Sequence, residues 1–546
     1  MKKPIIYQII PRLFANFNET RKHNGSKEEN GCGKLVDINE QALHSLSDLG
    51  ATHIWYTGII RHATAEHNNP AITKGKAGSP YAITDYYDIN PDLAVYEEKR
   101  MEEFEQLVAR THAAGMKVLI DFVPNHVARE YHSTQKPAGV EDLGEGDHPE
   151  WAFSPLNNFY YIPGERLTMD RDLQGYQENP AKVTGNDCFT SHPSVNDWYE
   201  TVKLNYGVYY QGGGEKQFFP IPSTWKKMAE ILLFWAGKQI DGVRVDMAEM
   251  VPVEFFQWAI AKVKKEYPDF LIIGECYDPG RYDAYIAAGF DYLYDKVGMY
   301  DYLRGVTSKN WPVEGITNQW MQHSGERLNH MLYFLENHDE QRIASGFFCG
   351  NGSCAEPAMI VAATLNQCPV MIYMGQELGE RGMDMEGFSG IDGRTTIFDY
   401  WGVKSIQAWA NKGKYDGALL SEEQRELRTF YQSLLTLARD NQAIQNGLMY
   451  DITYAQGEGF NKHEQFAFLR HKNEETLLII ANFHDREQKM HVRIPNDAFV
   501  YLGIDEKQKT TATDLLRGEQ YPIHLIANEP IELTLPAWRG VVLKID

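Results

Sequence analysis

Short apolar runs alternate with amphipathic helical segments from the start of the chain to about residue 435. Each run is too short for a buried helix and fits a strand that is covered on both faces. The runs lie at Ile5–Ile10, His53–Thr57, Val118–Val123, Val243–Val245, Leu271–Ile273, Tyr292–Tyr294, Met331–Leu335 and Val370–Tyr373. Eight strand–helix units of this kind predict an α/β fold, a closed parallel (β/α)8 TIM barrel rather than an open sheet.

Capping residues mark the helices between these strands. Asp37-Ile-Asn-Glu opens a helix that Gly50 closes. Ser223 is the expected cap of a helix over Thr224–Lys238, and Pro252 begins another. These signals place the helix ends close to the strands, as short βα connections require.

The alternation is interrupted once and then changes. Residues 128–196 are rich in Gly, Pro, His and aromatic residues and predict an inserted small domain after strand 3, which forms one wall of the cleft. Residues 1–127 and 197–440 then form the barrel. From 441 to 546 short alternating strands predict a C-terminal antiparallel β-sandwich of about a hundred residues.

Polar side chains follow four of the predicted barrel strands. Asp246, Glu275 and Asp339 each come directly after an apolar run, and Asp121 lies in the fourth segment, VLIDFVPNH. Barrel active sites collect at the C-terminal strand ends. Three acids at that edge suit glycosidic bond cleavage, where one carboxyl attacks and another donates a proton.

Composition excludes several classes of partner. The net charge of −22 argues against nucleic acid and anionic membranes, whereas a neutral polysaccharide is compatible with it. No apolar run approaches the roughly 20 residues of a membrane helix, and no export signal is visible, so the expected location is the cytoplasm. Cys349 and Cys354 flank a turn and are close enough to pair, but in this compartment we expect free thiols.

The ordered segments DFVPNH, GVRVDMAE, IIGECY and ENHDEQR resemble the four signature regions of the α-amylase family of glycoside hydrolases, family 13. IIYQIIPRLF, SPYAITDYYDINPDLA and PVMIYMGQELG are similar to further family segments, so the resemblance covers the whole chain. It implies that Asp246 is the nucleophile, Glu275 the acid/base and Asp339 the group that holds the sugar hydroxyls. Arg244, two residues before Asp246 on the same strand face, is expected to orient it.

The resemblance also implies binding residues. Tyr81 is expected to stack on the sugar, His126 and His338 to donate hydrogen bonds to it, and Arg342 to bind substrate. The chemistry requires no cofactor. Asn125 matches a calcium ligand of many amylases, so calcium is a candidate ion there, although Glu249-Met250 replaces a Lys-His pair found in those enzymes.

Several residues have a structural interpretation instead. Asp121 is expected to be hydrogen-bonded at the barrel rim, and His62 and His67 to be solvated beside a polar loop. The aromatic residues of the insertion fit either a sugar platform or the core of that domain. They are Trp151, Phe159, Tyr160 and Tyr161.

The leading interpretation is a retaining hydrolase of α-1,4 bonds in maltodextrin or starch fragments. An α-glucan transglycosylase or isomerase uses the same acids, and a non-catalytic barrel scaffold is the alternative outside the enzymes. Exo-acting α-glucosidases of the family carry an Asp three residues before the stacking Tyr, where this chain has Gly78. They also carry a QPDLN stretch, where this chain has SHPSVND at Ser191–Asp197. Both differences predict cleavage inside oligosaccharides.

Overall fold

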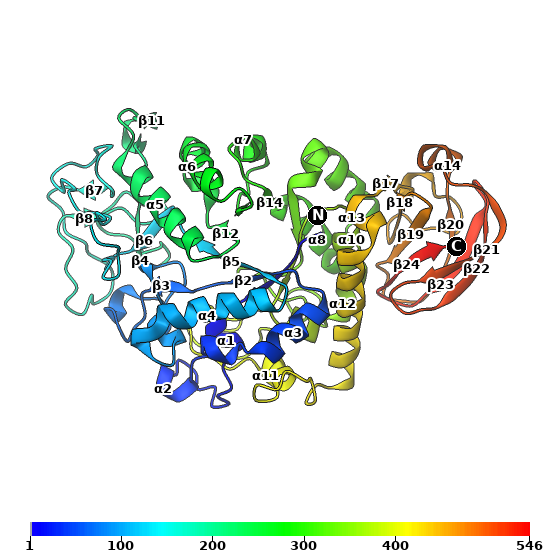
Figure 1. The fold of residues 1–546 in the computed structure, drawn as a ribbon, viewed down its shortest axis with the longest axis horizontal. Helices are drawn as coiled ribbons and strands as arrows, with labels where there is room; N and C mark the ends of the chain where they lie inside the picture. Colours follow the sequence, from blue (N-terminus) through cyan, green and yellow to red (C-terminus); the bar gives the residue numbers. More distant parts are fainter. Residues whose placement is uncertain (1–2) are drawn as a thin grey trace.

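Eight parallel strands close into a barrel at the centre of the computed structural model, which describes residues 3–546 (Figure 1). Around the barrel the strand order is β1-β16-β15-β14-β13-β12-β5-β2. The strands are β1 Ile5–Ile9, β2 His53–Tyr56, β5 Lys117–Phe122, β12 Gly242–Val245, β13 Leu271–Gly274, β14 Tyr292–Tyr294, β15 Met331–Phe334 and β16 Val370–Tyr373. The (β/α)8 fold expected from the apolar runs is confirmed.

Helices lie around the outside of this barrel (Figure 1). The longer ones are α3 Glu40–Leu49, α4 Arg100–Ala113, α5 Ser223–Gly237, α6 Val253–Glu266, α8 Asp301–Lys309, α10 Glu356–Thr364 and α12 Glu422–Asp440. The six-residue helix α7 covers Tyr282–Ala287. Short helices in the connections are α1 Pro11–Phe14, α2 Lys27–Asn30, α9 Ile316–Asn318, α11 Lys404–Ala410 and α13 Gln442–Asn446. Gly50 ends α3 in the left-handed conformation at φ +114°. Ser223 is the first residue of α5 and not its cap, because the chain enters the helix through Pro222.

A loop-rich insertion leaves the barrel after β5 and returns before α5, at the left of Figure 1. Its strands are β6 His126–Ala128, β7 Tyr161–Ile162, β8 Ala181–Lys182, β9 Thr201–Lys203, β10 Val208–Tyr209 and β11 Glu215–Lys216. β6 pairs antiparallel with β9, which ties the two ends of the insertion together. Phe159, Tyr160 and Tyr161 are buried within it, whereas Trp151 is exposed. β3 Ile60–His62 and β4 Ile83–Ile89 pair in the preceding β2–α4 connection.

The C-terminal part forms a six-stranded antiparallel sheet and a two-stranded one, at the right of Figure 1. In chain order the strands are β17 Leu448–Asp451, β18 Gln465–Lys472, β19 Glu475–Asn482, β20 Gln488–Arg493, β21 Lys507–Asp514, β22 Gln520–Leu525, β23 Pro530–Leu535 and β24 Arg539–Ile545. Helix α14 covers Asn496–Leu502. One face of the large sheet packs with the β20–β23 pair around an apolar core of its own, as in a sandwich.

The opposite face of the large sheet packs against the barrel. Phe466, Phe468 and Ile479 are buried in the same apolar cluster as the barrel helices. Glu356, at the start of α10, forms ion pairs with Arg517 at 2.6 Å and with Arg539 at 3.2 Å from the C-terminal part. Apolar contact and ion pairs therefore join the two parts.

One pair of cysteines departs from the expectation that all the thiols are free. Cys349 and Cys354 form a disulfide, with their Cα atoms 6.4 Å apart. The expectation of free thiols was wrong for this pair, because the short turn between the two residues returns the chain onto itself. Cys32, Cys188, Cys276 and Cys368 are free. Among the helices of residues 3–546, none combines the length and apolar character needed to cross a membrane.

Candidate active site

The parallel ladder between β5, β12 and β13 places Asp246 beside Glu275. Val245 lies opposite both Phe122 and Gly274 in the register. The ladder continues one residue further, where Asp246 N donates to Phe122 O at 2.8 Å. Glu275 N donates to Val245 O at 3.1 Å. The two acids therefore meet because neighbouring strands end at the same level, at the edge where barrel active sites collect.

Arg244 contacts both acids. Its Nη1 atom lies 2.6 Å from Asp246 Oδ1, and its Nη2 atom lies 2.8 Å from Glu275 Oε2. Nη1 also lies 3.5 Å from Asp121 Oδ1, and Trp55 Nε1 donates to the other oxygen of Asp121 at 3.0 Å. Since Arg244 is buried, its planar guanidinium has fixed partners and holds the carboxylates in place.

Asp339 and His338 form an ion pair in the turn after β15. Nε2 of His338 lies 3.1 Å from Asp339 Oδ2, and Asn337 Oδ1 accepts the Asp339 backbone N–H at 2.9 Å. Asp339 is half-exposed. Desolvation within the site opposes its ionisation, but His338 outweighs this effect and holds the Asp339 pKa at about 2. Burial lowers the His338 pKa, and Asp339 more than compensates, so that pKa is raised. Each member of the pair therefore favours the charged form of the other.

The pKa values of Glu275 and Asp246 are both raised. Burial raises the pKa of Glu275 against the pull of Arg244, and Asp246 and Asp339 add to the rise. Burial also raises the pKa of Asp246, which Arg244 opposes by charge and hydrogen bond. Because these groups interact strongly, a proton on one favours ionisation of the other. The direct hydrogen bond from Arg244 Nη1 favours the ionised state at Asp246 and the proton at Glu275.

A cavity of about 300 Å³ brings five of the predicted residues together, whereas Arg244 and His338 do not line it. Asp246, Glu275 and Asp339 line it with Tyr81 and His126. The Tyr81 ring stacks against the His338 ring, with centroids 5.3 Å apart and an angle of 25° between the ring planes. Burial and nearby Lys203 lower the pKa of His126 to about 3, so its ring is neutral and retains a hydrogen-bond acceptor as well as a donor.

Arg342 lies elsewhere. It is fully buried, its Nη1 atom binds Glu336 Oε2 at 2.8 Å, and its guanidinium stacks on Tyr373 at 3.9 Å. Its Nε atom donates to Thr395 Oγ1 at 2.9 Å. The sequence suggested a substrate-binding role, but the structure places Arg342 outside the cavity lining, where it braces the loops after β15 and β16.

Ten of the fifteen residues that line the cavity were not anticipated from the sequence, and they come from several loops. Trp198 and Glu200 come from the insertion, Lys74 from the segment between β3 and β4, and Met247 and Tyr277 from the turns after β12 and β13. Lys74 Nζ lies 2.9 Å from Glu200 Oε1, while Glu200 Oε2 is buried without a hydrogen-bond partner. Tyr277 lies two residues after Glu275, just beyond the end of β13, and its closeness to the predicted acid was the available signal. The others depend on loop conformation that no local pattern encodes.

The surroundings of Asn125 do not fit a calcium ion. Asn125 Oδ1 accepts a hydrogen bond from Lys203 Nζ at 2.8 Å, and Asn125 Nδ2 donates to Gly185 O at 2.8 Å. Lys203 is almost completely buried and also binds Asp187 Oδ1 at 2.6 Å. A divalent ion needs a cage of several free oxygens. Here an ammonium group takes the oxygens that Asn125 and Asp187 offer.

Replacement of Lys203 with Met tests this arrangement. The variant leaves the Asn125 oxygen and the Asp187 carboxylate without their partner, which costs about 1–3 kcal/mol. We expect a Tm several degrees below wild type by calorimetry, and no change in wild-type Tm on adding EDTA. Lys216→Met, which removes an exposed pair with Glu254, is the control and should change Tm little. A large fall in the wild-type Tm on adding EDTA, together with an unchanged Tm in Lys203→Met, would show that a metal ion rather than Lys203 holds these oxygens.

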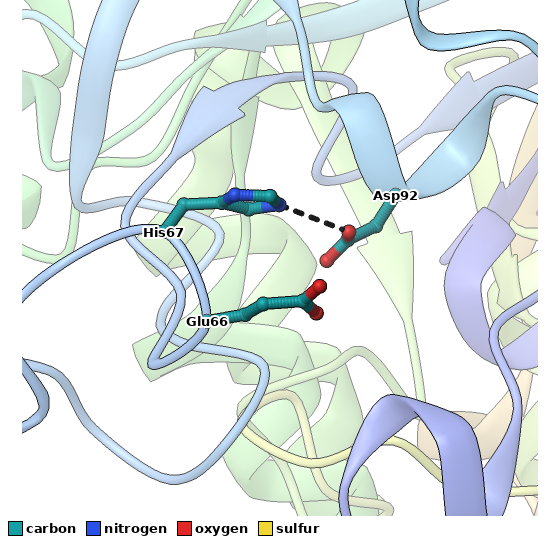
Figure 2. A group of neighbouring side chains, drawn as sticks. All are labelled: Glu66, His67 and Asp92. Atoms are coloured by element: carbon teal, nitrogen blue, oxygen red, sulfur yellow. Dashed lines mark hydrogen bonds and ion pairs between the residues drawn. The ribbon is translucent and has the colours of Figure 1, made fainter.

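A second polar cluster, Glu66, His67 and Asp92, has the ligand types of a metal site (Figure 2). The dashed line in Figure 2 joins His67 Nε2 to Asp92 Oδ1, which are 3.4 Å apart. Lys27 Nζ lies 2.8 Å from both Glu66 Oε2 and Asp92 Oδ1. A lysine ammonium thus already occupies the position between the two carboxylates. His62 nearby is buried against Asn90, so the expectation that it is solvated was wrong.

Comparison with known proteins identifies the family. The model of the alpha amylase catalytic domain matches residues 8–465. Alpha-amylase 3 of Dictyoglomus thermophilum is 24% identical over 469 residues, 82% of this chain and 79% of that protein. Maltase 1 of Drosophila virilis is 27% identical over 242 residues, which span 44% of this chain and only 31% of that protein.

A solved structure agrees in fold. The crystal structure of alpha-amylase from H. orenii superposes with a TM-score of 0.65 at 21% identity and covers 100% of both chains. Because the family model spans most of the sequence and the acids stand at the barrel edge, this chain belongs to the alpha-amylase family of glycoside hydrolases.

Proposed function

We propose that this enzyme hydrolyses α-1,4-glucosidic bonds in maltodextrin- or starch-type oligosaccharides with retention of the α configuration. The observation that supports retention is the single guanidinium of Arg244 in contact with both Asp246 and Glu275. Retaining glycosidases hold their two carboxyl groups about 5–5.5 Å apart, whereas inverting enzymes need about 6.5–9.5 Å to admit a water molecule. Shared contact with one side chain favours the closer spacing.

The proposed reaction has two steps. Asp246 attacks the anomeric carbon while Glu275 protonates the departing oxygen, so the glycosidic bond breaks and a glycosyl ester forms. Glu275, now a carboxylate, takes a proton from water, and the resulting hydroxide oxygen displaces Asp246. Asp339, held by His338, binds the sugar hydroxyls as the ring flattens, and the Tyr81 ring packs on the sugar face.

Gly78 supports action inside a chain. Its φ of +69° lies in the left-handed region, and a Cβ atom there would clash with the carbonyl oxygen of Ala63. The Asp that the resemblance associates with exo-acting α-glucosidases therefore has no place on this backbone. The insertion lines the cavity through Trp198 and Glu200, beyond the Ser191–Asp197 stretch.

One observation favours an exo-acting α-glucosidase as a second candidate. Glu275 directly follows β13, so in the proposed reaction the leaving group extends toward that side, and the glycone extends toward the loops after β2 and β5. Lys74 and Glu200 form their ion pair on those loops. If the Lys74–Glu200 ion pair persists when substrate binds, it restricts the glycone side of the cleft to one sugar. If the ion pair breaks, the two side chains can bind a second sugar.

A time course on maltoheptaose distinguishes these activities. We expect maltose and longer products first, with poor activity on maltose, and the new reducing end should appear as the α-anomer by NMR. Glucose as the only early small product would support the exo candidate, and products longer than maltoheptaose would support transfer. Pullulan, sucrose and trehalose, assayed separately, report linkage preference. An initial β-anomer would contradict retention.

A further inference from the structure

The two oxygens of Glu275 have different surroundings. Oε2 accepts the backbone N–H of Met247 at 2.7 Å and lies 2.8 Å from Arg244 Nη2. Oε1 lies 2.7 Å from the hydroxyl of Tyr277, which lines the same cavity. One oxygen thus faces an amide and a cation, and the other faces a phenol.

These partners determine where a proton can reside. A backbone N–H and a guanidinium only donate hydrogen bonds, so a proton on Oε2 would point at other donors. A tyrosine hydroxyl both donates and accepts. The acid form of Glu275 therefore carries its proton on Oε1, beside Tyr277.

The turn after β12 holds this arrangement in place. Met247 adopts a left-handed conformation at φ +43°, which is uncommon for a non-glycine residue. Two residues later, Glu249 Oε2 accepts the backbone N–H groups of Tyr277 and Asp278, each at 2.9 Å. One turn thereby supplies the N–H that binds Oε2 and the carboxylate that anchors the Tyr277 backbone.

We propose that Tyr277 is a positioning residue that directs the Oε1 proton of Glu275 to the glycosidic oxygen, an inference that rests on the proposed acid/base role of Glu275. In the resting acid form the phenol oxygen accepts the hydrogen bond from Oε1–H. When substrate binds, that proton turns to the glycosidic oxygen and the phenol O–H donates to Oε1 instead. The proton leaves with the departing sugar as the glycosidic bond breaks.

In the second step the Tyr277 hydroxyl stabilises the carboxylate form of Glu275. It donates to the Glu275 carboxylate until Oε1 takes a proton from the incoming water, whose oxygen forms the new bond to the anomeric carbon. The hydrogen bond thus favours the ionised form of Glu275 after the first step. Arg244 and Met247 keep Oε2 fixed throughout.

Tyr277→Phe removes the hydroxyl and keeps the ring. Because a hydrogen bond to the charged form lowers a pKa, its loss raises the pKa of Glu275. Activity is lost as pH rises through that pKa, so the basic limb of kcat/KM should move up by about one pH unit. On maltooligosaccharides kcat/KM should fall about 10-fold. An aryl maltoside with a good leaving group, which needs less protonation, should lose much less.

Tyr285→Phe is the matched control. The Tyr285 hydroxyl donates to the carbonyl oxygens of Ala248 and Val251 and supports the same turn without touching Glu275. It should lower Tm and leave the pH limb and the leaving-group dependence unchanged. A Tyr277→Phe variant with the wild-type basic limb and the wild-type leaving-group dependence would overturn the inference.

The Glu275→Gln variant distinguishes an error in the proposed acid/base role of Glu275 from an error in the role of Tyr277. If that variant keeps full turnover on maltooligosaccharides, the acid/base role itself is wrong. If it shows the loss expected of a missing acid while Tyr277→Phe behaves as wild type, the proposed function stands and only the role of Tyr277 is wrong.

Discussion

Asp246→Asn is expected to lower kcat on every α-glucan substrate by about 10⁴–10⁶-fold, the scale on which loss of a catalytic nucleophile is measured. An amide cannot form the glycosyl ester, and the strand offers no other carboxylate. Asn has nearly the same shape as Asp, and Arg244 keeps its contacts with Glu275 and Asp121. The fold should therefore persist, which circular dichroism and Tm will check beside the steady-state assay.

Asp241→Asn is a matched control at the other end of the same strand. Asp241 directly precedes β12, accepts the backbone N–H of Val118 at 2.8 Å and pairs with His112. Residues at the N-terminal face of a barrel serve stability rather than chemistry. This variant should lower Tm and keep turnover per folded molecule. Equal losses of activity in the two variants would point to misfolding and remove the nucleophile assignment.

Glu275→Gln should reduce kcat on maltooligosaccharides by about 10²–10⁴-fold, the usual worth of general acid–base catalysis. The amide retains an oxygen for the Met247 N–H and Arg244, but has no proton to give. Substrate binding should be nearly unchanged. The measurement is the ratio of kcat/KM for maltoheptaose to that for an aryl maltoside with a good leaving group, which should fall in the variant.

The pH profile of activity tests the role of Glu275 independently. Burial and the neighbouring acids raise the pKa of Glu275, so the wild type should stay active above the pH at which an ordinary glutamate has ionised. The basic limb should be absent in Glu275→Gln. A variant that keeps both wild-type turnover and the wild-type basic limb would show that another group donates the proton.

The barrel was predictable because burial dictates its sequence locally. A strand covered on both faces is mostly apolar along its length, and the runs at Met331–Leu335 and Val370–Tyr373 show this directly. Details that depend on a few atoms were less accessible. The chain enters α5 through Pro222 rather than a Ser223 cap, and Cys349 reaches Cys354 because of a turn geometry that spacing alone does not specify.

The acids of the site were predictable for the same reason, since each follows a strand whose end is defined by apolar residues. Residues on loops were not. Lys74 meets Glu200 only because the connection after β2 and the end of the insertion fold onto one another. Arg342 lies in a signature segment near Asp339, yet it turns inward to Glu336. Proximity in sequence to a functional residue did not determine the direction of its side chain.

The large C-terminal sheet has two apolar faces, one toward its own small partner sheet and one toward the barrel. A chain cut before β17 would leave the apolar outer side of α10 open to water and Glu356 without its two arginines. Exposed apolar surface of that kind promotes aggregation. We therefore expect the catalytic barrel to need the C-terminal sheet whenever it is transferred to another protein, by gene fusion or in evolution. A binding domain is better added after the sheet than substituted for it.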